Sequence, residues 1–229
     1  MATETKNGVI LLIGGCGYVG VNLSKKFVTC GYDVVVVDIS HCPTDIANIV
    51  TYHQCGATNS EALGAVIASS KPIAVIHLAS TGMSGSPMLN PACRTINVGA
   101  TEVAIECCVK GNVPVFIYTS TYNVVYGGKE IINGDEDTPY FPIEGHNDHY
   151  APSKTIAEKL ALAANGRTLA NGHKLKTCAI RPAAIYGEGE QRHFPRLLKH
   201  FDSGIFLFRI GTAIVDWVHV ENLVSEIVS

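Results

Sequence analysis

The stretch Val9-Ile10-Leu11-Leu12-Ile13-Gly14-Gly15-Cys16-Gly17-Tyr18-Val19-Gly20 decides how the chain is expected to fold. Five apolar residues end at a pair of glycines, which is typical of a buried strand that stops abruptly. From 18 to 29 the apolar residues recur at helical spacing, so a helix is predicted there. The glycines therefore lie in a tight turn between strand and helix, where a missing Cβ lets the backbone approach a diphosphate.

The glycine spacing matches two versions of the dinucleotide-binding fingerprint. Gly15, Gly17 and Gly20 satisfy G-x-G-x-x-G, and replacing Gly15 by Gly14 satisfies the looser G-x-x-G-x-x-G. In both versions the first turn of the helix offers backbone N–H groups and a partial positive charge to phosphate. The residues predicted to bind the cofactor here are Gly14, Gly17, Tyr18, Val19 and Gly20.

The second predicted strand ends in an acid, as the fingerprint requires. The β-branched run 34–37 closes on Asp38, which lies 18 positions after Gly20. An acid at this place accepts hydrogen bonds from the ribose hydroxyls of NAD and repels the 2′-phosphate of NADP. No Arg or Lys follows in 39–41, so NAD is the predicted cofactor.

The composition is that of an ordinary soluble globular protein. The chain has 229 residues, of which 47% are hydrophobic and 16% charged, and its net charge is −3. Lys and Arg form no block, so we expect no nucleic-acid partner. The eight Cys include no Cys-x-x-Cys pair, which favours buried free thiols in a reducing compartment over a metal site. We expect no transmembrane segment and a cytoplasmic location, with association to the endoplasmic reticulum membrane if a longer form exists.

Strands and helices alternate along the chain. Strands are predicted at 9–13, 34–37, 49–53, 73–79, 113–118 and 175–180, and helices at 18–29, 60–70, 95–109 and 150–164. This alternation predicts an α/β fold, a Rossmann-type doubly wound parallel sheet of order 3-2-1-4-5-6 with the ligand at the carboxyl ends of the strands. We predict an NAD-binding domain at 1–185 and a small, truncated C-terminal substrate lobe at 186–229.

Tyr150-Ala151-Pro152-Ser153-Lys154 places a tyrosine and a lysine one turn apart on one helix face. Pro152 fits only a first turn, so Tyr150 should lie at or just before the start of the helix. The ordinary pKa of a tyrosine phenol is about 10. An ammonium one turn away, together with a positive nicotinamide ring, would favour the phenolate form. Tyr150 is therefore the predicted acid/base, and a hydroxyl after the fifth strand, Thr121 or Ser120, is predicted to orient the substrate oxygen.

Taken together, these motifs resemble the extended short-chain dehydrogenase/reductases, in particular the 3-beta-hydroxysteroid dehydrogenase/isomerase family. The resemblance runs over essentially the whole length, and its signposts are 14–20, Asp38, 77–80, 97–101, 118–121, Tyr150 with Lys154, 181–187 and 216–220. The segments 122–128 and 187–193 suggest the steroid branch.

The resemblance implies roles for individual residues. Tyr150 would be the acid/base with Lys154 as its partner, and Thr121 stands at the position of the catalytic Ser or Thr. Asn97 matches a structural or proton-relay asparagine. The resemblance also implies which residues line the cofactor: Ala79 and Thr119 beside the ribose and pyrophosphate, Lys154 at the nicotinamide ribose, and Pro182 and Ala183 at the nicotinamide.

The chain departs from the family pattern in three places. Ala57 stands where an acid for the adenine is expected, and Ile13 replaces the usual Thr before the glycines. Relatives continue well beyond Ser229, so the substrate lobe is expected to be partial here.

Three functions remain open from the sequence. The first is NAD-dependent oxidation or reduction of an apolar small-molecule substrate such as a steroid, and the second is an NDP-sugar epimerase or dehydratase, which would use basic residues such as Arg192, Arg196 and Lys199. The third is NAD binding without activity. We also consider a homodimer. His77 is predicted to be a satisfied core histidine, and Trp217 to serve in packing.

Overall fold

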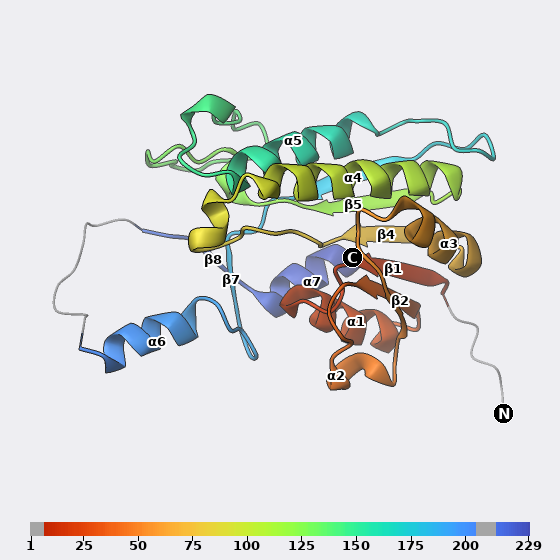
Figure 1. Ribbon diagram of the computed structural model, residues 1–229, viewed down its shortest axis with the longest axis horizontal. Coiled ribbons are helices and arrows are strands. Elements are labelled where there is room, and N and C mark those ends of the chain that lie inside the picture. The colour runs from red at the N-terminus through yellow and green to blue at the C-terminus, as the bar shows by residue number, and fades with distance from the viewer. Residues whose placement is uncertain (1–6, 205–213) are drawn as a thin grey trace.

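The structure is a computed structural model that describes residues 7–204 and 214–229. Its centre is a six-stranded sheet of order β3-β2-β1-β4-β5-β6, in which every neighbouring pair is parallel (Figure 1). The predicted strand order is therefore confirmed. The strands are β1 Val9–Ile13, β2 Asp33–Asp38, β3 Thr51–Gln54, β4 Ala74–His77, β5 Val115–Thr119 and β6 Lys176–Ile180.

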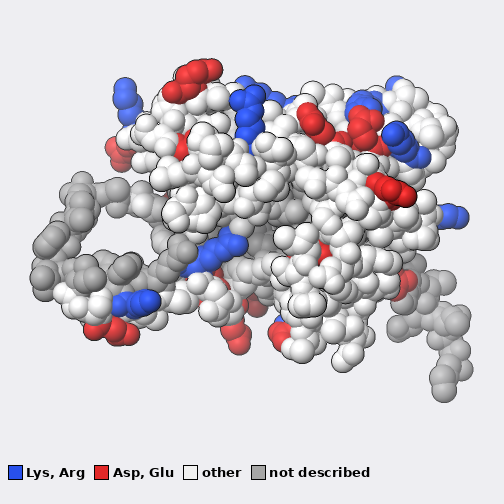
Figure 2. All heavy atoms as spheres, viewed as in Figure 1, with Lys and Arg blue, Asp and Glu red and all other residues white. Residues whose placement is uncertain are grey.

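Helices cover both faces of the sheet, with α3, α4 and α5 on one side and α1, α2 and α7 on the other (Figure 1). The helices that pack on the sheet are α1 Tyr18–Thr29, α2 Thr44–Ala47, α3 Ser60–Ser70, α4 Ala92–Lys110, α5 Tyr150–Ala163 and α7 Val220–Val228, while α6 is Phe194–Asp202. Described charged side chains of both signs are scattered over the face that Figure 2 shows, some of them next to one another.

The apolar runs of β1 and β2 exist because both faces of each strand are buried. Successive side chains point to opposite faces, so Leu11 and Val35 enter the core under α3–α5, whereas Leu12 and Val36 enter the core under α1 and α7. All four are 5% exposed or less. A strand that alternated apolar with polar residues could not lie at this central position.

Element boundaries differ from the prediction by a few residues. β3 begins at Thr51 rather than at 49, and β4 is confined to 74–77. α4 begins at Ala92 rather than 95, because Pro91 occupies the N-cap position and the Asn90 side chain accepts the Ala92 N–H. A second, two-stranded sheet of β7 Ala184–Tyr186 and β8 Trp217–His219 was not predicted.

The C-terminal helix α7 packs against α1 and completes one core of the nucleotide fold. Its side chains Leu223, Val224 and Ile227 are buried with Leu23 of α1. This helix lies within 186–229, the range predicted to form a substrate lobe, and the division of the chain after residue 185 stays a prediction.

All eight cysteines are free, as expected, but they are not all buried. Cys93, Cys107 and Cys108 are buried, whereas Cys178 is exposed. In the described ranges, no helix combines the length and apolar character needed to cross a bilayer.

Candidate active site at the carboxyl edge of the sheet

The glycine turn is packed against the ends of two neighbouring strands. Gly14 has a φ of +82°, and a Cβ there would lie 2.5 Å from the backbone nitrogen of Ala79. A Cβ on Gly20 would lie 2.5 Å from the Cα of Gly15. At Gly17 the nearest atom to such a Cβ is 3.5 Å away, so this side of the turn is open. No side chain of the described residues caps the start of α1, which leaves its first N–H groups to an anion.

Asp38 holds the carboxyl end of β2 beside the glycine turn. One carboxylate oxygen accepts the Cys16 N–H at 3.0 Å, and the other accepts the Ser40 N–H at 2.9 Å. An ionised carboxylate has about four acceptor positions, so two bonds leave capacity for ribose hydroxyls. The acid predicted from the fingerprint is therefore placed where it can meet a nucleotide bound at the turn.

Tyr150 is the first residue of α5, as the position of Pro152 predicted, and its side chain is buried. Burial raises the pKa of its phenol to about 12, while the Ser80 hydroxyl and the Arg192 guanidinium oppose that rise. The expectation that Lys154 together with a bound nicotinamide favours the phenolate stays a prediction, and the structure adds that burial opposes it. Removal from water outweighs the nearby positive charge.

Lys154 is buried one turn after Tyr150. Its Nζ donates a 2.6 Å hydrogen bond to the carbonyl of Thr119 and lies 4.2 Å from the centre of the Tyr118 ring. Burial lowers the pKa of this ammonium to about 7, and the carboxylate of Glu158 opposes that shift. The lysine is thus hydrogen-bonded to Thr119 at the end of β5, which is itself one of the residues predicted to bind the cofactor.

Asn97 braces the start of α5 from α4. Its Nδ2 donates to the carbonyl of Thr81 at 3.0 Å and to Ser153 Oγ at 2.9 Å, and its Oδ1 accepts the Thr81 N–H at 2.8 Å. Ser153 Oγ in turn donates to the carbonyl of Tyr150 at 2.6 Å. Of the two roles that the family resemblance implies for Asn97, these contacts favour the structural one.

Thr121 is buried at the start of the short helix η2 (Tyr122–Val124), where its Oγ1 accepts the Asn123 N–H at 3.3 Å. The backbone around it is joined to the end of β6, because Tyr122 N donates to the carbonyl of Pro182 at 3.3 Å. The half-buried Ala183 follows directly. The loops after β5 and β6 thus lie side by side.

Several buried polar atoms at this edge have no hydrogen-bond partner among the described residues. They include the hydroxyls of Tyr18 and Thr119. Buried donors and acceptors are rarely left unpaired in proteins, so these hydroxyls are available to a bound molecule. His77 was predicted to be a satisfied core histidine; it is in the core, but neither ring nitrogen is paired within the described part of the chain.

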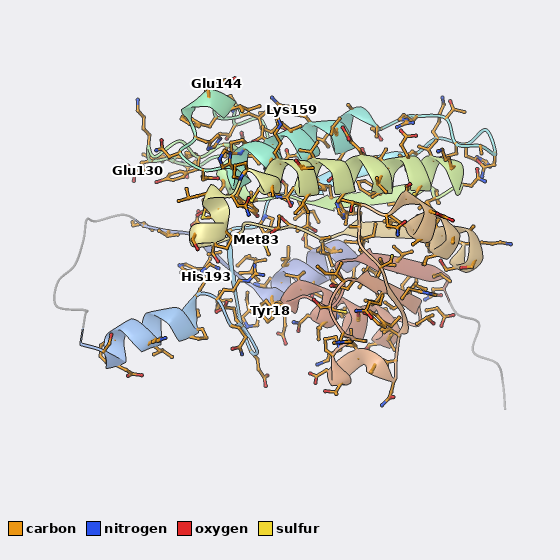
Figure 3. The ribbon with its side chains drawn as sticks, viewed as in Figure 1. Tyr18, Met83, Glu130, Glu144, Lys159 and His193 are labelled. Atoms are coloured by element: carbon orange, nitrogen blue, oxygen red, sulfur yellow. The ribbon has the colours of Figure 1, made fainter. Side chains whose placement is uncertain are left out.

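In the view of Figure 3, the labels Tyr18, Met83 and His193 lie below α4, while Glu144 and Lys159 lie at the upper edge of the molecule. Arg192, one of the basic residues weighed for a sugar diphosphate, is exposed and lies with its Nη1 3.0 Å from Met83 Sδ. Lys199 is exposed on α6, and the side chain of Arg196 lies outside the described residues.

Trp217 packs as predicted but stays 46% exposed. Its ring contacts those of Tyr186, His193 and Phe194, with centroids 5.4 to 6.3 Å apart.

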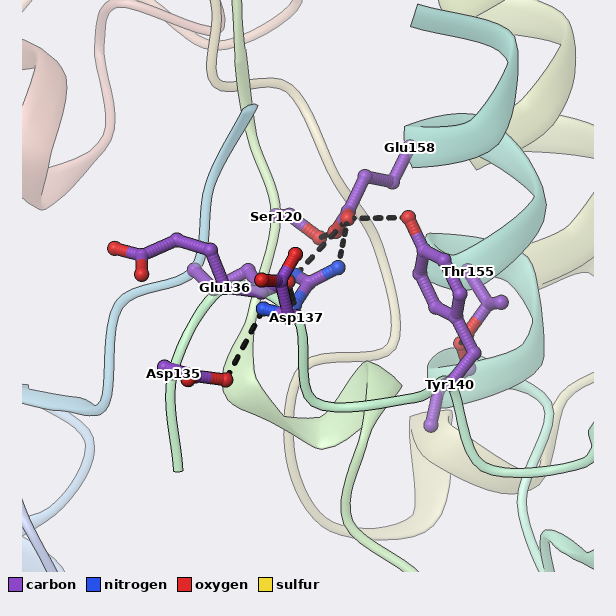
Figure 4. Close-up of polar contacts among 9 residues, drawn as sticks. Ser120, Asp135, Glu136, Asp137, Tyr140, Thr155 and Glu158 are labelled. Atoms are coloured by element: carbon purple, nitrogen blue, oxygen red, sulfur yellow. Dashed lines mark hydrogen bonds and ion pairs between the residues drawn. The ribbon is translucent and has the colours of Figure 1, made fainter. Parts of the chain in front are cut away.

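The sequence reasoning missed a buried polar cluster around Glu158, which Figure 4 shows. Glu158 accepts hydrogen bonds from Ser120, Tyr140 and Arg181. One signal was available, because Glu158 follows Lys154 by four residues and so shares its helix face. Its partners lie far away in sequence, and no local spacing indicates them.

Comparison with known proteins places the chain. The model of the 3-beta hydroxysteroid dehydrogenase/isomerase family matches residues 11–229. "Short-chain dehydrogenase/reductase family 42E member 1" of Bos taurus is 43% identical over 224 residues, which cover 94% of this chain and 56% of that protein. The "3-beta-hydroxysteroid dehydrogenase" of Mycolicibacterium neoaurum is 30% identical over 96% of this chain and 60% of its own length. The chain thus spans under two thirds of the length of these curated relatives.

Among solved structures, the UDP-glucose 4-epimerase of Thermus thermophilus in complex with NAD superposes with a TM-score of 0.80. It is 19% identical, and the match covers 96% of this chain and 73% of that one. Such a likeness supports the fold alone. On the family match and the identity to its relatives, the chain belongs to the 3-beta hydroxysteroid dehydrogenase/isomerase family.

Proposed function

We propose that the chain binds NAD at the carboxyl edge of the sheet and is the nucleotide-binding part of an oxidoreductase acting on the CH–OH group of an apolar alcohol or the matching ketone. A 3-beta-hydroxysteroid or related sterol is the favoured substrate class, because the family and the bacterial relative are named for it. The observation that carries the proposal is that Tyr150 and Lys154, both buried on α5, lie at the same sheet edge as the glycine turn.

The residues at this edge suit a dinucleotide. The open side of Gly17 and the uncapped start of α1 suit a diphosphate, and Asp38 retains acceptor capacity for a ribose. NAD, when bound, supplies the acceptor of a hydride from the alcohol carbon. The residues that would hold it are Gly14, Gly17, Tyr18, Val19 and Gly20 at the diphosphate, Asp38 at the adenosine ribose, and Ala79, Thr119, Lys154, Pro182 and Ala183 towards the nicotinamide.

Tyr150 would exchange a proton with the substrate oxygen. Because burial holds its pKa near 12, the phenol is protonated at neutral pH, which is the form that donates a proton to a carbonyl in reduction. In oxidation the phenolate is needed, and the positive charges of Lys154 and Arg192 would favour it. The hydroxyl of Thr121 would hydrogen-bond the substrate oxygen and orient it.

Replacing Tyr150 with Phe tests this assignment. We expect the rate at which NAD is reduced to NADH with a 3-beta-hydroxysteroid as substrate to fall by about 10²–10⁴-fold, because the proton-transfer group is lost. The dissociation constant for NAD, measured by calorimetry, should stay nearly unchanged. Tyr32→Phe is the matched control, because Tyr32 packs against Phe27 in a core away from the site.

The substrate class is tested by offering the wild-type protein a 3-beta-hydroxysteroid, a simple secondary alcohol and UDP-glucose. Turnover of the steroid supports the proposal. Turnover of UDP-glucose alone would overturn the substrate class, and wild-type rates in Tyr150→Phe would overturn the acid/base assignment. NAD binding with no turnover would show a nucleotide-binding chain without this activity.

A further inference from the structure

Glu158 is a buried carboxylate whose acceptor positions are filled from three separate segments. It is 1% exposed. Its Oε1 accepts from the Tyr140 hydroxyl at 2.7 Å and from Arg181 Nε and Nη2 at 2.9 and 2.8 Å, and its Oε2 accepts from Ser120 Oγ (Figure 4). A buried charge needs such a set of partners, because its removal from water otherwise costs several kcal/mol.

Two of these partners lie next to a residue of the proposed site. Ser120 precedes Thr121, and Arg181 precedes Pro182. The two segments are also joined directly, since Ser120 N donates to the carbonyl of Ile180 at 2.7 Å. A single side chain of α5 therefore fixes both loops against the helix that bears Tyr150 and Lys154.

The long loop before α5 closes over the same cluster. The Arg181 guanidinium stacks on the Tyr140 ring at 4.9 Å, and Lys159 Nζ lies 4.6 Å from that ring. Arg181 Nη1 also reaches the carbonyl of Glu136 at 3.5 Å. These contacts orient the guanidinium, so that its position relative to Glu158 is set by more than one segment.

The described ionisable groups around Lys154 differ in charge, and Glu158 is the one that carries a negative charge at neutral pH. His77 of β4 and Tyr118 of β5 face the lysine, and burial keeps both neutral at pH 7, since it lowers the pKa of the histidine to about 3 and raises that of the phenol. Tyr150 is likewise neutral at that pH, because burial raises its pKa. Among the described residues, Glu158 is the carboxylate whose charge acts on Lys154 to favour the ammonium.

We propose that Glu158 is a positioning residue that holds the loops after β5 and β6 in place and acts by its charge on Lys154, one turn before it on the same face of α5, for binding a nicotinamide ribose. The proposal rests on the proposed function only for the identity of that ligand. The hold on the loops and the effect on Lys154 are properties of the protein alone.

Glu158→Gln keeps the shape of the side chain and removes its charge. The test is the pKa of Lys154, followed by NMR in lysine-labelled protein without cofactor, with Lys154→Met to assign the signal. We expect this pKa to fall from about 7 by a unit or more, so that the ammonium is at least about fivefold less populated at pH 7. The dissociation constant for NAD at pH 7 should rise several-fold, and this rise should shrink at lower pH, where the lysine is protonated again.

Glu106→Gln is the matched control, because Glu106 also pairs with an arginine, its Oε1 lying 2.7 Å from Arg167 Nη1 on the outer surface. This variant should leave the Lys154 pKa and NAD affinity unchanged. If Glu158→Gln does not fold, the double variant Glu158→Gln/Arg181→Gln replaces it, since the Arg181 guanidinium would otherwise be left without its carboxylate partner. The Lys154 pKa should fall in this variant too.

The two proposals can fail separately. A wild-type protein that does not bind NAD would overturn the proposed function, while the Lys154 pKa in the free protein would still decide the role of Glu158. A folded Glu158→Gln or double variant with an unchanged Lys154 pKa would overturn that role, whatever NAD does. So would an equal change in Glu106→Gln.

Discussion

The two ends of the proposed nucleotide site are built from different materials. The end at β1 and β2 is made mostly of backbone: a glycine turn, the first N–H groups of α1, and one carboxylate, Asp38, held by two N–H groups. The end at β5 and β6 is made of buried side chains, with Lys154, Tyr150 and Glu158 all 6% exposed or less. The first end depends on glycines that let chain segments approach, and the second depends on how far burial shifts ionisable groups.

The backbone-built end should break when one Cβ is added. Gly14→Ala puts a methyl group 2.5 Å from the Ala79 nitrogen at a φ of +82°. We expect a loss of about 2–4 kcal/mol in the free energy of unfolding, from the left-handed conformation and the clash together. NAD affinity should fall at least about tenfold because the turn must move. Denaturant unfolding and calorimetry measure the two effects.

Gly166→Ala separates strain from clash. Gly166 has a φ of +79°, and a Cβ added there would meet no atom within 4 Å. This control should lose only about 1 kcal/mol and keep its NAD affinity. Equal effects in the two variants would show that the close approach to Ala79 is unimportant.

Burial also shifts the pKa of His77 of β4, which faces Lys154 of the side-chain-built end, and this shift should appear in the pH dependence of stability. Burial, with a smaller effect of Lys154, lowers the pKa of His77 to about 3. Below pH 6.5 the unfolded chain therefore takes up a proton that the folded protein does not, so stability falls as pH falls. The loss from this residue at pH 5 should reach about 2 kcal/mol relative to pH well above 6.5, most of it between pH 6.5 and 5. Urea unfolding of wild type and His77→Leu across that range should show the variant losing less.

His173→Leu, in an exposed turn, is the control for this experiment. It should follow the wild-type pH dependence. If His77→Leu also follows the wild-type curve, then His77 is not held neutral in the core and the electrostatic description of this end is wrong.

The contrast also explains what the sequence could predict. Local spacing predicts the strand order, the glycine turn, Asp38 and the start of α5 at Tyr150. It can do so because the repeat of apolar residues, the glycines and Pro152 each constrain only a few neighbouring residues. The packing of α7 on α1 joins segments about 200 residues apart, and no local pattern encodes it.

The same limit applies to the ionisable groups. The sequence places Lys154 one turn from Tyr150, which predicts that the phenolate is favoured once a nicotinamide is bound, but local spacing does not show that burial raises the phenol pKa. The cluster of Glu158 with Tyr140 and Arg181 spans 18 and 23 residues and forms only when α5 packs beside β5 and β6. Solvent exposure and long-range contacts, which decide these properties, are products of the fold.

The most direct test of the account is the crystal structure of this chain with NAD. We predict the diphosphate at the start of α1 beside Gly17, a ribose on Asp38, and the nicotinamide facing the Tyr150 hydroxyl and Lys154. A protein that shows no NAD at the glycine turn, or a bound NAD with the Tyr150 hydroxyl directed away from the nicotinamide, would contradict it.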